Sequence, residues 1–154
     1  LNRQNTDINA LLNSAIDDCA MLARKNNITV KRVSTNSSIY YSLDYHWFYR
    51  ALVNLISNAI GFASKHVLVS VNYDDQALTL TIEDDGKGIA PDKLDVIFTP
   101  FVKLEAERSR EQGHFGLGLA ICVKVIDWHQ GTIAASNRNS LSGACFTLTL
   151  PINS

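Results

Sequence analysis

Two segments of eight residues, 66–73 (HVLVSVNY) and 77–84 (ALTLTIED), alternate apolar and polar side chains and are separated by only three residues. A period of two places the apolar side chains on one face of a strand, and a short connection joins antiparallel neighbours. The two segments therefore predict a β-hairpin with one buried face. A sheet with one apolar face needs a second layer to cover it, and the rest of the chain has to supply that layer.

The remaining elements follow from the same kind of periodicity. Apolar side chains recur at helical spacing over three stretches, and Asp7 and Asp44 are N-cap candidates for the first two. These predicted helices span 7–25, 45–63 and about 116–129, and alternating stretches at 28–33, 38–43, 131–138 and 144–150 predict strands. The order predicts an α/β two-layer sandwich, with a mixed, mostly antiparallel sheet of about five strands covered on one face by about three helices.

Composition limits the class of protein. A chain of 154 residues suits one domain, and its net charge of −1 without long charged blocks argues against nucleic-acid and membrane-surface binding. The cysteines, Cys19, Cys122 and Cys145, have no disulfide or zinc spacing, so we expect reduced, structural thiols in a cytosolic setting. No apolar run approaches the roughly 18 residues that a membrane-spanning helix needs, so we expect none in this chain. Because the chain begins with Leu1 rather than methionine, we expect a fragment of a longer protein.

The second predicted helix carries two asparagines four residues apart, Asn54 and Asn58. This spacing places both side chains on one helix face, away from the main apolar stripe, and Gly61 falls on the same face. Taken alone, two solvent-facing asparagines are the simpler interpretation. The alternative is an amide pair that faces a ligand or a metal.

A second polar motif, IEDDGKGIAP (82–91), follows the end of a predicted strand. A carboxylate at a strand end can accept a hydrogen bond from a ligand amine, and neighbouring glycines allow a ligand to approach the backbone. A polar Asp-Gly turn explains the motif equally well.

The third motif, GHFGLGLAI (113–121), places glycines where a helix is predicted to begin. Glycine is a poor helix former, but free N–H groups at a helix N-terminus bind anions such as phosphate. The pattern matches neither the Walker motif nor the dinucleotide fingerprint. A flexible loop is the alternative interpretation.

Taken in order, the motifs resemble a known family. NLISNA (54–59), DDGKGI (84–89), IFTPF (97–101) and GLGL (116–119) are similar to the N, G1, F and G2 boxes of the GHKL ATP-binding superfamily. The closest resemblance is to the catalytic ATP-binding domain (HATPase_c) of bacterial two-component sensor histidine kinases, and it extends from about residue 7 to Pro151. It implies a Bergerat-type fold, one domain over 1–154, and an ATP lid at 99–115.

The resemblance also implies roles for individual residues. Asn58 is expected to bind Mg²⁺, Asn54 to support the metal and the phosphates, and Asp84 to accept a hydrogen bond from the adenine amino group; the two asparagines are the expected catalytic residues. Further contacts to the nucleotide are expected from the base pocket, the F box, the lid and the second glycine box. These residues are Phe62, Gly86, Gly88, Ile89, Phe98, Arg108, Arg110, Gly116, Leu117, Gly118 and Leu119.

The function implied is binding of Mg-ATP and transfer of its γ-phosphoryl group to a histidine on a separate dimerisation domain. No histidine followed by Glu or Asp and then Pro is present in this chain. The implied partners are that histidine-phosphotransfer domain and a downstream response regulator. The full-length protein is expected to be a homodimer and this fragment a monomer without nucleic-acid or membrane contacts. The implied location is cytoplasmic, in an inner-membrane-anchored bacterial sensor.

Three alternatives remain open at this point. Gyrase-like ATPases carry a glutamate one turn before the metal-binding asparagine, where this chain has Asn54. Anti-sigma-factor-like serine kinases share the fold but are short, complete chains. A degenerate nucleotide-binding or docking module is the third alternative, because sensor kinases often have Lys or Arg at the position of Gly61. Arg108 and Arg110 could replace that missing charge.

Overall fold

The computed structural model describes residues 1–154 except 34–36, 95, 99–115, 138–139 and 153–154. Its main sheet has five strands in the order β2-β4-β5-β7-β6. The bounds are β2 Thr29–Arg32, β4 His66–Tyr73, β5 Ala77–Asp84, β6 Thr132–Ser136 and β7 Cys145–Pro151. The β2–β4 pair is parallel and the other three pairs are antiparallel. The predicted hairpin is β4–β5, and the predicted mixed sheet is confirmed.

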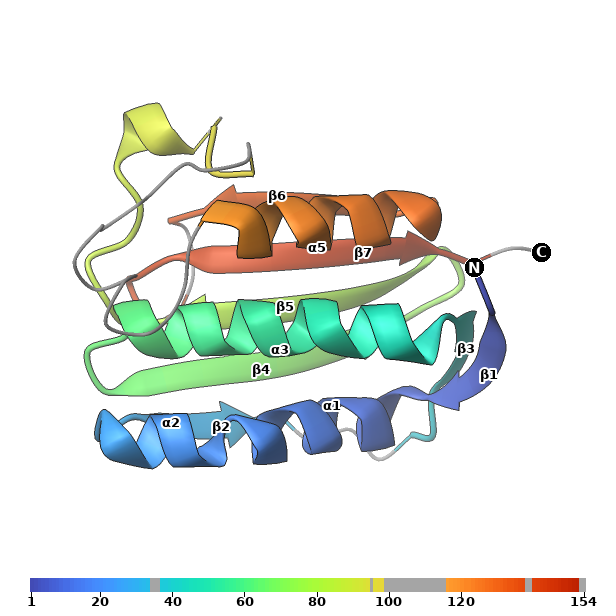
Figure 1. Cartoon of the computed structure of the whole chain (residues 1–154), viewed down its shortest axis with the longest axis horizontal. Coiled ribbons are helices and arrows are strands. Elements are labelled where there is room, and N and C mark those ends of the chain that lie inside the picture. The colour runs from blue at the N-terminus through green and yellow to red at the C-terminus, as the bar shows by residue number, and fades with distance from the viewer. Residues whose placement is uncertain (34–36, 95, 99–115, 138–139, 153–154) are drawn as a thin grey trace.

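Helices cover one face of this sheet (Figure 1). They are α1 Ile8–Asp18, α2 Ala20–Lys25, α3 Tyr45–Phe62 and α5 Gly116–Trp128, and a short 3₁₀ helix, η1, spans Pro91–Lys93. The predicted helix at 7–25 is two helices, because the N–H of Cys19 bonds to the carbonyl of Ile16, three residues back. This tighter bond ends the first helix. The core lies between the helices and the inward face of the sheet, where side chains such as Leu55, Val69 and Leu80 are buried.

A second, two-stranded sheet lies at one end of the main sheet. Strand β1 (Gln4–Asp7) pairs antiparallel with β3 (Tyr40–Leu43). The sequence predicted β3 but not its partner, because β1 (QNTD) has no apolar alternation and pairs with residues more than 30 positions away. The Tyr41 hydroxyl donates a 2.6 Å hydrogen bond to the carbonyl of Pro151, which ties this ribbon to the end of β7.

The N-terminus of α3 is fixed by Asp44 and His129. The Asp44 carboxylate accepts a hydrogen bond from the N–H of Trp47, which confirms the predicted cap. The Asp44 N–H donates to Nε2 of His129, and Nδ1 of His129 donates to the carbonyl of Val125 on α5. Burial lowers the pKa of this fully buried imidazole, so it stays neutral and joins α3 to α5.

The C-terminal end of α3 is connected to β4 through Asp85. Its carboxylate accepts hydrogen bonds from the N–H groups of Ser64, Lys65 and His66 at 2.8–3.0 Å. Burial opposes ionisation, but the bonds from Lys65, His66 and Ser64 outweigh it and lower the pKa of Asp85 from 3.8 to about 2. Asp85 therefore holds the turn that follows the helix.

We expect Asp85→Asn to lower the free energy of unfolding by about 2 kcal/mol near neutral pH. The pKa of Asp85 is lower in the folded protein than its ordinary value of 3.8, so the ionised carboxylate stabilises the fold fully at any pH above 3.8. Its contribution is lost as the pH falls through about 2. Denaturant titrations of the parent and the variant should therefore converge in strong acid. A penalty that is the same at neutral and at acidic pH would contradict a role for the charge.

Candidate functional site

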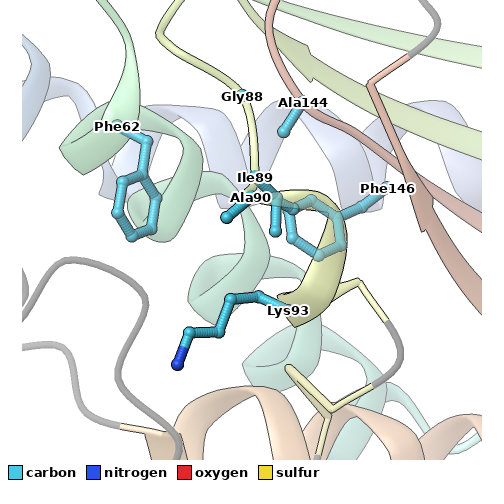
Figure 2. A pocket seen from close by; sticks show the side chains of 7 residues that line it. All are labelled: Phe62, Gly88, Ile89, Ala90, Lys93, Ala144 and Phe146. Atoms are coloured by element: carbon cyan, nitrogen blue, oxygen red, sulfur yellow. The ribbon is translucent and has the colours of Figure 1, made fainter.

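A cavity opens where the end of α3, the segment after β5 and the start of β7 meet (Figure 2). It is lined by Phe62, Gly88, Ile89, Ala90, Lys93, Ala144 and Phe146. Its volume of about 120 Å³ is below the roughly 300–1,000 Å³ of pockets that hold a whole drug-sized ligand. The size and the mostly apolar walls suit one ring system of a larger molecule.

A buried carboxylate adjoins the cavity at the end of β5. Asp84 is only 1% exposed. Its Oδ1 accepts hydrogen bonds from the N–H of Gly86 at 2.8 Å and from the N–H of Ala144, which lines the cavity, at 3.3 Å. Gly86 itself lies against the carbonyl of Phe62, where a Cβ atom would collide. The glycine thus lets the segment after β5 pack directly on the end of α3.

Asn137 holds the other side of this segment. Its Oδ1 accepts a hydrogen bond from the N–H of Ile89 at 2.8 Å, and its Nδ2 donates to the carbonyl of Ile89 at 2.7 Å. The preceding residue, Gly88, has a φ of +79°, in the region that favours glycine. Together they fix Ile89 in the cavity wall. The sequence motifs did not single out Asn137, because nothing local links it to a residue 48 positions earlier.

The two asparagines of α3 lie one and two turns before Phe62. Asn58 is 8% exposed, and its Nδ2 has no hydrogen-bond partner among the described residues. Asn54 is half-buried, and neither side chain lines the cavity. The spacing of four residues places Asn54, Asn58 and Phe62 on one stripe of the helix that leads to the cavity. Gly61 is buried on the same helix.

The remaining predicted residues fall into three groups. Phe62, Gly88 and Ile89 line the cavity. Phe98 packs edge-on against the cavity residue Phe146 with ring centroids 6.0 Å apart, but it does not itself line the cavity. The others are farther along the chain. Gly116, Leu117 and Gly118 form the first turn of α5, and Leu119 is buried on that helix. Arg108 and Arg110, with the predicted lid, lie outside the described residues.

Four cavity residues had no site role in the sequence analysis: Ala90, Lys93, Ala144 and Phe146. The alternation of β7 indicates that Phe146 points inward, but it does not distinguish a cavity wall from the core. Nothing in the sequence indicated that Lys93 lines a cavity, because a lysine in a polar loop is usually solvated.

No group of three or more His, Cys, Asp or Glu side chains that could hold a metal ion occurs in the part of the chain that the structure describes. In the same described part, none of the helices has the length and apolar character needed to cross a membrane.

Comparison with known proteins identifies the family. Residues 43–154 match the family described as histidine kinase-, DNA gyrase B- and HSP90-like ATPases. The chain is 32% identical over 152 residues to the sensor histidine kinase ZraS of Escherichia coli strain K12, which is 97% of this chain and 31% of that protein. It thus spans about a third of the length of that relative.

Solved structures agree in fold. The catalytic domain of the histidine kinase ThkA has a TM-score of 0.84 at 24% identity, covering 98% of both chains. The ATP-binding domain of PrrB from Mycobacterium tuberculosis has a TM-score of 0.80 at 25% identity, covering all of both chains. With the family match over most of its length, the chain belongs to the family of histidine kinase-, DNA gyrase B- and HSP90-like ATPases.

Proposed function

We propose that this domain binds Mg-ATP and transfers the γ-phosphoryl group to a histidine on a separate dimerisation domain. The observation that carries the proposal is the apolar cavity beside the buried carboxylate of Asp84. Adenine is a flat ring system with one amino group at its edge. The ring suits the walls formed by Phe62 and Ile89, and the carboxylate is the acceptor that the amino group requires.

The phosphates would lie toward α3 and the N-terminus of α5. The Nδ2 of Asn58 supports this arrangement, because it is buried without a hydrogen-bond partner among the described residues and a ligand can supply one. The amide oxygen of Asn58 would bind Mg²⁺, with Asn54 one turn earlier supporting the same group. Backbone N–H groups at Gly116 and Gly118 would face the phosphates. When bound, Mg²⁺ neutralises charge on the phosphate oxygens during transfer.

The partners proposed for this domain come from its relatives. ZraS is a sensor histidine kinase. We therefore propose that the full-length protein that contains this domain is a homodimer and that it carries the acceptor histidine. A response regulator then receives the phosphoryl group. The domain is cytoplasmic, in a membrane-anchored sensor.

Two measurements test the proposal. Calorimetry of this chain should detect ATP binding that is tighter with Mg²⁺ than without it. The full-length protein that contains this domain, incubated with γ-labelled ATP, should acquire a label that is acid-labile and base-stable. If ATP binds but no label appears, the domain is a nucleotide-binding module without transfer; if ATP does not bind, the site assignment is wrong.

We expect the isolated domain to hydrolyse ATP slowly, far below about one turnover per second, because no general base activates water at Asn54. An amide accepts no proton near neutral pH. Release of inorganic phosphate from the purified domain provides the measurement. Several turnovers per second would favour the gyrase-like ATPases over the histidine kinases.

Asn137→Ala should weaken the binding of ATP and of adenosine alike, by about tenfold, because it removes both hydrogen bonds that hold Ile89 in the cavity wall. Calorimetry with both ligands measures the effect. Asn72→Ala, at an exposed asparagine on β4, is the matched control and should change neither affinity. Unchanged binding by the Asn137 variant would show that the base does not contact this wall.

A further inference from the structure

Lys93 is the one charged side chain among the residues that line the cavity. It lies at the end of η1, is half-buried, and extends from this short helix so that its ammonium group lies on the same side of the cavity as the Phe62 ring (Figure 2). Among the described residues, it forms no ion pair. An ammonium beside an apolar cavity can pair with an anionic group carried by a ring that occupies the cavity.

The charges around the cavity explain why such a cation is needed. Asp84 is buried beside it, and the C-terminal end of α3, which carries partial negative charge, ends there at Phe62. The last turn of α3 contains no basic residue, and Arg50, three turns earlier, is the only Lys or Arg on this helix. Among the residues that line the cavity, Lys93 alone carries a positive charge that can offset this negative charge when an anionic ligand binds.

We propose that Lys93 is a nucleotide-binding residue whose ammonium group contacts a phosphate oxygen of the nucleotide whose base occupies the cavity. The proposal rests on the proposed function, since it requires adenine in the cavity. It assigns to η1 the positive charge that α3 lacks near Gly61. The aliphatic part of the side chain forms the cavity wall, and the charged end recognises the phosphate.

The test compares adenosine, ADP and ATP binding to the domain by calorimetry. Lys93→Gln should weaken ATP and ADP binding by about tenfold and change adenosine binding less than about twofold, because only the phosphates lose a charged partner. Lys93→Arg should restore most of the affinity. Lys87→Gln removes an exposed lysine from the same segment and should leave all three affinities unchanged.

The outcomes separate this proposal from the proposed function. If the parent domain binds ATP and Lys93→Gln binds it equally well, Lys93 has no phosphate contact and the proposed function stands. If Lys93→Gln weakens the binding of adenosine as much as the binding of ATP, the side chain acts only through packing and the proposal is wrong. If the parent domain binds none of the three ligands, the proposed function itself fails.

Discussion

Asp84→Ala should abolish detectable adenine-nucleotide binding, with a loss of at least about 100-fold in affinity. The variant removes the buried acceptor proposed for the adenine amino group. It also leaves the N–H groups of Gly86 and Ala144 without that partner, so the cavity wall loses support. Calorimetry with ATP and ADP measures the loss, and thermal unfolding shows whether the variant remains folded.

Two controls separate recognition from packing. Inosine triphosphate lacks the adenine amino group, so the parent domain should bind it at least about tenfold more weakly than ATP. Asp85→Asn changes the adjacent carboxylate, which bonds to the N–H groups at 64–66, and should lower stability while leaving ATP affinity within about twofold. Equal affinity for ATP and inosine triphosphate would contradict the role of Asp84.

Asn58→Ala should remove the dependence of ATP binding on Mg²⁺ and lower phosphoryl transfer in the parent protein by about 1,000-fold or more. The physical reason is that a misplaced metal no longer neutralises charge as the γ-phosphoryl group leaves. The fold should survive, because Nδ2 of Asn58 has no hydrogen-bond partner to lose among the described residues. Calorimetry with and without Mg²⁺, followed by labelling with γ-labelled ATP, provides the measurement.

Ser57→Ala is the matched control for this variant. Ser57 is the neighbouring buried polar residue on α3, and its hydroxyl donates to the carbonyl of Val53 within the same helix. Its loss should leave the Mg²⁺ dependence and the transfer rate unchanged. A strong Mg²⁺ dependence that persists in Asn58→Ala would place the metal ligand elsewhere in the chain.

Local features of the sequence determined the hairpin of β4 and β5, the strands β6 and β7, and the start of α3 at its Asp44 cap. Alternation and capping depend on neighbours within a few residues, so a linear pattern is sufficient to predict them. The ordered motifs also identified the family, and they placed Phe62, Gly88 and Ile89 in a site, which the cavity brings together.

The tertiary structure alone decided which other side chains complete the cavity. Ala144 and Phe146 reach it because β7 pairs with β5, and Asn137 reaches Ile89 because the end of β6 lies beside the segment after β5. Lys93 faces the cavity only because η1 packs over it. The same reason explains why β1 was missed: its partner, β3, lies more than 30 residues away, and contacts across such separations leave no periodic signal in the chain.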